Sequence, residues 1–517
     1  MDWSKTTPGR LAPSAPRLQH ALCLTHKQDM PAAFRPALIA LLALLASCSD
    51  PRDDGEIDVS VIGERARLVD PDRGPLSPAD ATLAGSTAMG LVAVDGSGQV
   101  EPALAESWIV TGDGLSTIFR IRQAQWPDGS DVTGEDVARS LNRAIAPDSR
   151  NPLKPLLTAV DGFVGMTGRV IEVRLKVPRP NLLQLLAQPE MGIRRDGRGT
   201  GPFRIARIRG HSIRLAPIFH EDDPPDQKPD SVLLRHERAA LAIARFKADS
   251  SDLVTGGTLA DWPVVRAAKM RPGVLRFDAG QGLFGLEVVG KSAFLSTSIV
   301  RNALSMAIDR NSLPRVLDID GWTVANTVLP TQLDSATPPA RPEWAGNTIA
   351  QRRAAAAERV VDWRSGGRTP PVLRVAMPAG PGMRLLFARI STDWQRIGVR
   401  AVAVPLQAPD ADLRLIDAIA PNTSANWFLT RLSCAAGLVC DGKGDNSLSA
   451  SRSAKTLEAR AARIADADAD LTARASFIPL GFPVRWLLVD PSLTGWKENL
   501  LGMHPLNELR PPRSIAN

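Results

Sequence analysis

Two glycine-rich stretches match patterns that bind nucleotides, and they are the most obvious candidates for chemistry. Residues 280–285 fit the pattern GxGxxG, and residues 285–292 fit the phosphate-loop pattern GxxxxGK[ST]. Both patterns need a loop whose backbone N–H groups face phosphates, with a helix opening directly after it. Residues 286–289 read LEVV, which predicts a β-strand instead, and the next helix is expected to begin near Ser296 or Ser298. We therefore expect neither stretch to bind a nucleotide.

Signatures of common hydrolases and metal sites are missing from the sequence. There is no GxSxG, HExxH, CxxC or HxxxH spacing. The histidines that follow Cys48 are scattered along the chain at His211, His220, His236 and His504. Asp and Glu are plentiful, but no spacing singles out a pair for acid–base work. The sequence thus predicts no enzyme, no cofactor and no metal site.

An apolar run near the N-terminus predicts export. Residues 37–46 read ALIALLALLA and follow Arg35. Ten residues are too few to span a bilayer, but they suit the apolar region of a signal peptide. The next residues, Leu45-Ala46-Ser47-Cys48, resemble the lipobox of bacterial lipoproteins, in which the cysteine is lipidated and becomes the mature N-terminus. We therefore expect a periplasmic protein that is anchored to the cell envelope by a lipid on Cys48.

The alternative for this run is a buried amphipathic helix with an incidental cysteine. The polar segment at residues 49–56, SDPRDDGE, favours a short tether and argues against that alternative. Residues 1–29 do not fit an export signal, so Met30 is a plausible start of translation. The predicted limits are residues 1–48 for the signal peptide and 49–56 for the tether.

Two further cysteines lie six positions apart, at Cys434 and Cys440. With Cys48 lipidated, they are an even pair in an oxidising compartment, so we predict a local disulfide. A metal site would need more ligands than these two thiols.

The composition is that of a folded globular protein. Of 517 residues, 44% are apolar and 23% charged, and the net charge of +7 comes without a dense basic run. This length predicts about three domains or subdomains, and this charge pattern argues against a nucleic-acid binder. There are 13 Phe and 11 Trp but no Tyr, so a ligand pocket must use Trp or Phe for its aromatic contacts. Trp108 and Trp126 are expected in the core.

Alternating and helical periodicities place the secondary structure. Strands are expected at residues 57–62, 116–121, 169–177, 372–378 and 399–405. Helices are expected at residues 136–145, 298–310, 348–363, 384–398 and 457–475, and residues 235–254 are expected to form a helix, a loop and a short strand. Thr133 and Asp136 read as a capping box. The strands at 372–378 and 399–405 flank a helix, which predicts a β-α-β unit with parallel pairing.

Four blocks resemble the family 5 extracytoplasmic solute-binding proteins, the oligopeptide- and dipeptide-type components of ABC importers. Residues 101–145 contain EPALAESW, a Gly-Asp-Gly turn, STIFRIR and WPDGSDVTGEDVARSLNR. GTGPF at 199–203, VRNALSMAIDR at 300–310 and IPLGFPVRW at 478–486 follow in the family's order. Phe203 stands where the family often has Tyr.

This resemblance implies an α/β fold, specifically a two-lobed periplasmic-binding-protein fold of type II, large and peptide-binding-type, with an extra subdomain in lobe I. The implied limits are 57–278 for lobe I with a subdomain at about 75–190, 279–479 for lobe II, and 480–517 for the return to lobe I. The crossovers would fall near 280–290 and 475–482, which gives the glycine-rich stretches a role as a hinge.

The resemblance also implies a function. A monomer would capture a peptide-like or other small solute between its lobes and deliver it to ABC permease subunits in the inner membrane. The alternative is a non-transport envelope sensor or scaffold on the same fold, whose partner is another protein.

The ligand-contacting residues implied by the resemblance lie in three places. These are Glu64 and Arg65 after the first strand, Phe284 and Glu287 on the hinge strand, and Trp427 and Arg431 in a lobe II loop. Peptide-binding members carry an Asp for the ligand's α-ammonium in a segment like W-x-x-D-Y-x-D-P. The corresponding stretch is expected at residues 425–445, which lacks that motif. An ordinary peptide ligand is therefore in doubt; a modified peptide, a glycoside or a siderophore-like compound stays open.

Overall fold

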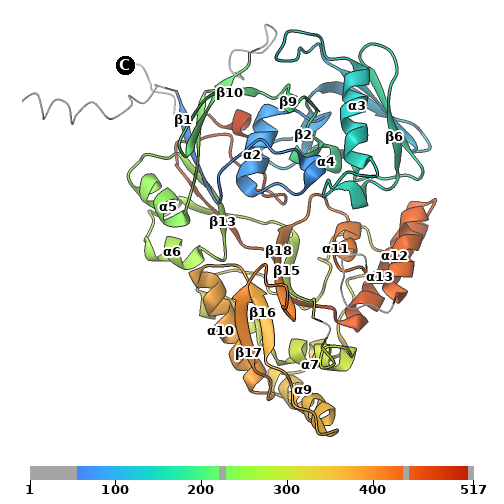
Figure 1. Ribbon diagram of the computed structural model, residues 1–517, viewed down its shortest axis with the longest axis vertical. Coiled ribbons are helices and arrows are strands. Elements are labelled where there is room, and N and C mark those ends of the chain that lie inside the picture. The colour runs from blue at the N-terminus through green and yellow to red at the C-terminus, as the bar shows by residue number, and fades with distance from the viewer. Residues whose placement is uncertain (1–54, 220–228, 291, 435–441, 511–517) are drawn as a thin grey trace, which may run out of the picture. The chain divides into compact units, whose positions relative to one another are not determined.

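The computed structural model describes residues 55–219, 229–290, 292–434 and 442–510. The described residues from 55 onward form one compact unit, in which α-helices and mixed β-sheets alternate along the chain (Figure 1). The N-terminal 48 residues, including Cys48, lie outside the described residues, as does Cys440. The signal peptide, the lipid anchor and the disulfide therefore stay predictions.

The largest sheet has seven strands. Their spatial order is β10 (Phe203–Arg209), β11 (Ser212–Pro217), β12 (Val232–Glu237), β1 (Ile57–Ile62), β13 (Leu253–Thr258), β20 (Arg485–Val489) and β14 (Leu275–Asp278). The central strands β12, β1 and β13 run parallel, and the outer strands pair antiparallel. Helix α2 (Pro78–Thr87) contacts β1 and β10, and α5 (Ala239–Lys247) contacts β1 and β13. This burial on both faces suits parallel strands.

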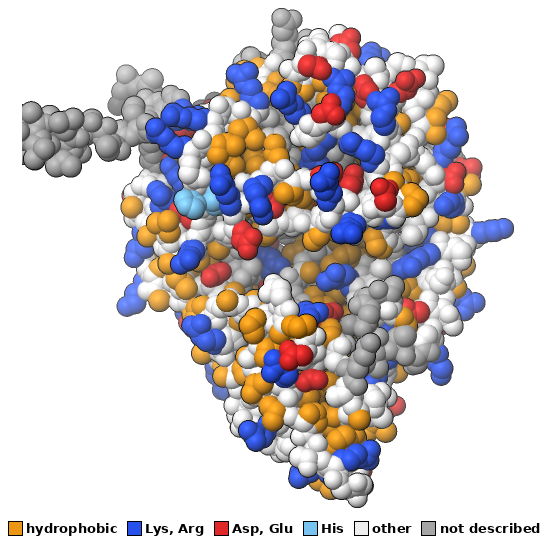
Figure 2. Space-filling model, in the orientation of Figure 1, with side chains coloured by type: hydrophobic (Ala, Val, Ile, Leu, Met, Phe, Trp, Pro, Cys, Tyr) orange, Lys and Arg blue, Asp and Glu red, His pale blue; other side chains and the backbone are white. Residues whose placement is uncertain are grey.

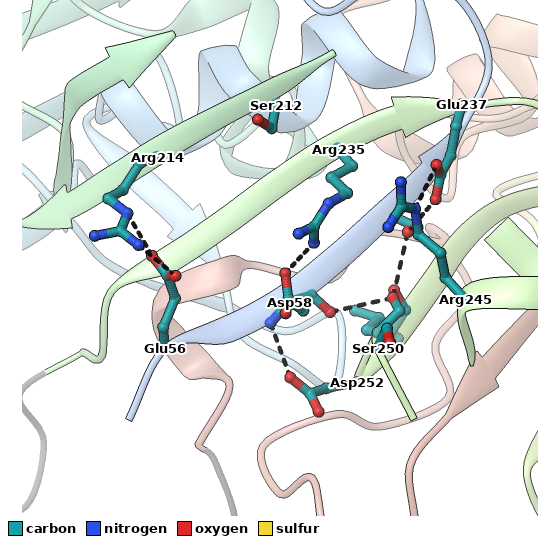
Figure 3. A network of polar contacts seen from close by, with 12 residues as sticks. Glu56, Asp58, Ser212, Arg214, Arg235, Glu237, Arg245, Ser250 and Asp252 are labelled. Atoms are coloured by element: carbon teal, nitrogen blue, oxygen red, sulfur yellow. Dashed lines mark hydrogen bonds and ion pairs between the residues drawn. The ribbon is translucent and has the colours of Figure 1, made fainter. Parts of the chain in front are cut away.

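Strand β1 carries apolar side chains on one face and polar side chains on the other, and every side chain of the strand is buried. The polar face forms the network in Figure 3. Asp58 forms an ion pair with Arg235 of β12, and Ser60 Oγ donates to Glu237 Oε1 at 2.7 Å. Arg245 of α5 donates from Nε to Glu237 Oε2 at 2.9 Å. These contacts satisfy buried polar groups that would otherwise destabilise the sheet.

A second sheet has five strands, and two short connections join it to the seven-stranded sheet. Its order is β17 (Ala401–Pro405), β16 (Leu373–Met377), β18 (Leu413–Ile419), β15 (Gly282–Val288) and β19 (Phe477–Gly481). Strands β16 and β17 are parallel and joined by α10 (Pro381–Gln395), so the predicted β-α-β unit is confirmed. Helices α7 (Ser298–Ala307), α8 (Leu313–Leu317) and α9 (Ile349–Arg364) share an apolar cluster with this sheet and with α6 (Trp262–Ala267).

The chain passes between the two sheets twice. Strand β14 leads into β15 through residues 279–281, and β19 leads into β20 through residues 482–484. The stretch that matches the phosphate loop runs along β15, and the next helix begins only at Ser298. The predicted strand and the predicted start of the next helix are therefore confirmed.

A smaller four-stranded antiparallel sheet lies within residues 105–175. Its order is β4 (Ala105–Val110), β5 (Ser116–Ile121), β7 (Val170–Leu175) and β6 (Val160–Gly165). Helix α3 (Gly134–Ile145) packs on it, and Thr133 Oγ1 accepts from the backbone N–H of Asp136, as expected of the cap. Trp126 is 3% exposed and Trp108 packs against the same apolar cluster, as predicted. Strands β2 (Val92–Val94) and β3 (Val100–Pro102) form a hairpin, and β8 (Arg194–Arg195) pairs with β9 (Arg198–Gly199).

Three helices lie between β18 and β19 in the described part of the chain, and Figure 1 shows α12 beside α13. They are α11 (Ala425–Arg431), α12 (Lys443–Ser453) and α13 (Leu457–Arg474). Their apolar side chains join those of the four-stranded sheet and of α4 (Leu182–Leu186) in one cluster. Polar contacts cross the same junction: Thr423 donates from its backbone N–H to Gln184 Oε1 at 2.9 Å, and Gln188 Nε2 donates to Pro421 O at 2.9 Å.

One expected element was wrong in detail. Residues 235–237 are the end of strand β12, and the helix predicted from residue 235 begins at Ala239. The segment HERAALAIARF carries helical periodicity across this boundary, but the first residues pair with β1 in the sheet. Tertiary pairing therefore overrides local helix propensity at this boundary.

Candidate solute-binding pocket

A cavity of about 980 Å³ lies between the seven-stranded sheet, helix α2 and the C-terminal segment 501–508. Strands β13 and β20 contribute to its wall from the seven-stranded sheet, and Asp417, Ala418 and Ile419 contribute from the end of β18 in the five-stranded sheet. Figure 2 shows the surface hollowed between α2 and β18, with Lys and Arg side chains near its rim. This size suits a small organic solute, and both large sheets touch the space.

An ion pair joins the two sheets in the wall of this cavity. Arg485 of β20 donates from Nη1 to Asp417 Oδ1 at 2.7 Å, and Asp417 lies on β18. The two side chains are 19% and 12% exposed. A largely buried pair of this kind neutralises both charges locally, so the wall offers a dipole at this point and not a free carboxylate.

A second pair lies near the C-terminal segment. His504 Nε2 is 2.9 Å from Asp278 Oδ2, and the backbone N–H of Asn499 donates to Asp278 Oδ1 at 3.2 Å. Both paired side chains are almost fully buried. Asp278 ends β14, directly before the first crossover between the sheets. This pair therefore holds the C-terminal segment against the start of the crossover.

A third charged group in the wall has no such pair. Glu101, Glu508 and Arg122 all line the cavity. Burial raises the pKa of Glu101 to about 7, with further contributions from the charges of Glu508 and Asp95, while Arg122 lowers it. A carboxyl with this pKa changes its charge near neutral pH. The pocket therefore has one wall whose charge depends on pH.

The rest of the wall is mostly aliphatic. Apart from the imidazole of His504, Trp486 is the only aromatic side chain among the described residues of the lining. Its indole Nε1 donates to Thr258 O at 2.8 Å, so that donor is already used. Of the Trp and Phe side chains that were expected to supply aromatic contacts, only the ring of Trp486 lines this pocket among the described residues.

None of the six predicted ligand residues is among the described residues that line this cavity. Glu64 and Arg65 are exposed after β1. Trp427 packs at 89° against Phe428 in the apolar cluster beneath α11. Their role in ligand contact stays a prediction, but their side chains are not brought together at this pocket.

The two residues predicted on the hinge strand do lie on β15, but elsewhere. Phe284 is 1% exposed and packs edge-on against Trp322 with ring centroids 5.6 Å apart. Burial raises the pKa of Glu287, and the charges of Arg431 and Arg414 lower it. Arg431 and Glu287 are thus close enough to interact, which is the one pairing among the six that the structure brings near.

A model of a known protein family matches the central part of the chain. The family model described as "Bacterial extracellular solute-binding proteins, family 5 Middle" matches residues 99–430, more than half of the chain. The chain belongs to this family. Members of family 5 are transport binding proteins and not enzymes.

Individual relatives of family 5 are distant. The periplasmic oligopeptide-binding protein OppA of Haemophilus influenzae is 21% identical over 459 residues, 79% of this chain and 84% of that protein. The probable deoxycholate-binding periplasmic protein YgiS of Escherichia coli is 34% identical over 120 residues, which is 20% of this chain and 22% of that protein. Their names state a periplasmic location, which supports the same location for this chain.

Solved structures establish the fold. The murein tripeptide binding protein MppA of Escherichia coli superposes with a TM-score of 0.78 at 19% identity, covering 89% of this chain and 99% of that one. Haemophilus influenzae OppA in complex with the peptide RPPGFSPFR gives 0.76 at 18% identity, covering 89% of this chain and 99% of that one. The predicted two-lobed α/β fold of the periplasmic binding proteins is thus confirmed.

The family's helix block VRNALSMAIDR has a structural role that the sequence alone did not reveal. Arg310 is 4% exposed and donates from Nε to Pro479 O at 2.7 Å and from Nη1 to Ser305 O at 2.8 Å. Arg301 donates from Nη2 to Arg474 O at 2.6 Å. Both arginines therefore bind backbone carbonyls in or just before β19, the strand that precedes the second connection between the sheets.

The part of the five-stranded sheet that lines the cavity lies before residues 425–445 in the chain, so an acidic partner for a ligand would be expected there. The cavity wall contributed by the five-stranded sheet is the end of β18, and the following residues, 418–431, contain no Asp or Glu. Asp417 itself is paired with Arg485. A topological signal, the end of a strand next to a crossover, could have located this wall.

The described residues contain no group of three His, Cys, Asp or Glu side chains that could hold a metal ion. Within the same residues, no helix combines the length and apolar character that crossing a membrane requires.

Proposed function

We propose that this protein captures a small solute in the 980 Å³ cavity and delivers it to the permease subunits of an ABC importer. The observation that supports this most directly is that both large sheets contribute to the cavity wall, through Arg485 and Asp417. A solute that contacts both walls would favour the arrangement that brings them together, in proportion to its differential affinity for it.

Two lobes would then move about the crossovers. We assign residues 57–278 and 480–517 to lobe I and 279–479 to lobe II. The strand composition of the two sheets supports this division, because the seven-stranded sheet takes strands from residues 57–278 and 485–489 and the five-stranded sheet takes strands from 282–481. Short connections at residues 279–281 and 482–484 would serve as the hinge.

We infer that the wall from β18 does not bind a free α-ammonium group of the solute. A buried ammonium needs a carboxylate partner, and the wall from β18 offers only Asp417, which Arg485 already neutralises. Relatives carry names that span an oligopeptide, glutathione and, as probable, deoxycholate. A mainly aliphatic wall, with two paired carboxylates and with Glu101 largely protonated below pH 7, suits an amphipathic solute that brings few unpaired charges of its own.

Ligand identification on the purified protein tests this function. Native mass spectrometry reports any co-purified solute, and thermal shifts report binding from a panel of N-acetylated peptides, free peptides, glycosides and bile salts. We expect a saturable rise in melting temperature with one class, and for peptides a preference for the N-acetylated form. No shift with any class and no co-purified solute would contradict solute capture and would favour the sensor or scaffold alternative.

A pair of matched variants tests whether the solute binds in this cavity. Ala418 lines the cavity and Ala403 is exposed on strand β17. Ala418→Trp places a large ring in the cavity and is expected to weaken the solute at least tenfold. Ala403→Trp adds the same ring on an exposed strand and should leave the affinity unchanged. Equal affinity in both variants would place the solute elsewhere.

The anchor is part of the same proposal. A diacylglyceryl group on Cys48 would hold the protein at the envelope, near its permease. Metabolic labelling with a palmitate analogue is expected to mark the wild type and not Cys48→Ser. Labelling of both proteins would contradict this attachment point.

A further inference from the structure

A small pocket lies at the junction between residues 156–185 and 422–460. Its volume is about 30 Å³, enough for one or two atoms of the size of a water molecule. It is separate from the large cavity, and no residue lines both. Its polar lining comes from Arg179, Asn181, Asn422, Ser424, Asn426 and Arg460.

The polar part of this lining is built into the fold. Asn422 is 5% exposed, Ser424 is 3% exposed and Arg460 is 5% exposed. Arg460 forms an ion pair with Asp334, and its Nη2 donates to Ser424 Oγ at 3.0 Å. Asp334 also accepts from the backbone N–H of Ala425 at 2.7 Å. Arg460 is therefore held in one position beside the pocket.

Positive charge exceeds negative charge around Arg179. The neighbouring charges that act on its guanidinium are those of Arg460, Arg452 and the single carboxylate Asp334. Burial, assisted by the two arginines, lowers the pKa of Arg179 to about 10. Arg179 itself donates to the backbone carbonyls of Pro178 and Arg452. Among the described residues here, Asp334 is the carboxylate that acts on Arg179, while Asp445 acts on Arg452 and also pairs with Arg474. Four guanidinium groups thus face two carboxylates.

Burying like charges together is costly unless an opposite charge joins them. The pocket has N–H donors on two guanidinium groups and on carboxamides that can surround an anion. A volume of about 30 Å³ is close to that of one water molecule and favours a monatomic ion over a larger anion.

We propose that the pocket between Arg179, Asn422 and Arg460 binds a chloride-sized inorganic anion. The anion stabilises the junction because Arg179 belongs to the stretch before α4, whereas Asn422 and Arg460 belong to the stretch from the end of β18 to α13. The same junction carries the hydrogen bond of Gln184 to Thr423. By the proposed division Arg179 belongs to lobe I and Asn422 and Arg460 belong to lobe II, so the anion would also favour the arrangement that brings the lobes together. The anion is not the transported solute, and its binding can be tested without that solute.

The test compares anions at constant ionic strength. The full purified chain is melted in sodium gluconate with increasing chloride, bromide or acetate. Chloride and bromide are expected to raise the melting temperature in a saturable way, and acetate is not. Identical melting in gluconate and chloride would overturn the proposal. A larger shift with acetate than with chloride would also overturn it, since a carboxylate would then be the preferred occupant.

Variants separate this site from general salt effects. Arg179→Met is expected to weaken the apparent chloride affinity at least tenfold, whereas Arg276→Met, at an exposed position on β14, is expected to keep the wild-type response. A full chloride response in Arg179→Met would overturn the proposal. If Arg179→Met does not fold, a crystal soaked in bromide decides the matter: anomalous density between Arg179 and Arg460 supports the site, and its absence there overturns it.

Discussion

Arg485 and Asp417 join the two large sheets through a hydrogen bond of 2.7 Å between Nη1 and Oδ1. Arg485 also donates to the backbone carbonyl of Asp417 at 3.4 Å. Both residues lie in the cavity wall, so the pair links sheet packing to the proposed solute site. Its position beside the crossovers makes it the contact that any movement of one sheet relative to the other must change.

Arg485→Met is expected to destabilise the protein by about 2–4 kcal/mol, because it leaves a largely buried carboxylate without its partner. The double variant Arg485→Met/Asp417→Asn should recover part of that loss, since no charge is then left unpaired. Urea unfolding measures both. Arg271→Met is the control, because its pair with Asp249 is more than half exposed on both sides and should contribute less than about 1 kcal/mol. Equal effects at the two sites would contradict the role of the Arg485 pair.

Glu101 predicts a specific pH dependence. Its pKa is raised from 4.5 to about 7 by burial and by Glu508. Between pH 4.5 and pH 7, the folded protein therefore keeps a proton on Glu101 that the unfolded chain has released. Stability from this group is therefore present below pH 4.5 and lost as pH rises toward 7. Because Glu101 is only partly buried, we expect about 1 kcal/mol.

Unfolding midpoints between pH 4.5 and 8 test this. Glu101→Gln should flatten the decline, while Glu358→Gln on the exposed side of α9 should leave it unchanged. The pKa of Asp468 is also raised by burial, to about 6, so some decline will remain in Glu101→Gln. An unchanged slope in that variant would show that Glu101 is ionised throughout.

Much of the fold could be predicted from local patterns. Strand β1, the Thr133 cap of α3 and the parallel β16–α10–β17 unit all follow from periodicity and capping residues. The glycine-rich decoys could be dismissed because LEVV reads as a strand, and it is one. Local patterns succeed in these cases because burial acts on the same residues that set the periodicity.

The pocket could not be predicted in the same way. Its wall combines β13, the end of β18 and the segment 501–508, which lie far apart in the sequence. Phe284 is predicted as a ligand contact because it lies on the hinge strand, but its side chain packs in the core against Trp322. Strand alternation puts neighbouring side chains on opposite faces, but both faces of β15 are packed, because Leu283 joins one apolar cluster and Phe284 and Leu286 join another. Alternation therefore does not show which side chain reaches a pocket.

Gly282, at the start of β15, lies where only a glycine fits against the neighbouring strand. A Cβ at this position would lie 2.0 Å from the carbonyl oxygen of Ala418 on β18. Gly282→Ala must therefore push β15 away from its partner strand, and we expect a loss of about 2–4 kcal/mol. Gly112→Ala is the matched control, because nothing lies within 4 Å of its Cβ. Chemical denaturation of both variants measures this, and comparable stabilities would contradict the close approach.

Arg310 provides the sharpest test of the family's helix block. Burial lowers its pKa to about 9, and its hydrogen bonds reach Pro479 and Ser305 in two directions. A lysine carries one nitrogen in place of the planar fork, and burial would lower its pKa further below its usual value, so Arg310→Lys is not conservative. We expect a loss of about 2–4 kcal/mol in urea unfolding.

The control for this variant is Arg315→Lys on the exposed side of α8, which should change the unfolding free energy by less than about 0.5 kcal/mol. Because Pro479 lies in β19, directly before the connection to β20, Arg310→Lys should also speed amide hydrogen exchange in β19 and in its partner β15. Wild-type exchange in both strands would show that Arg310 does not hold this connection, even if the variant were less stable, because the loss would then come from elsewhere in the helix.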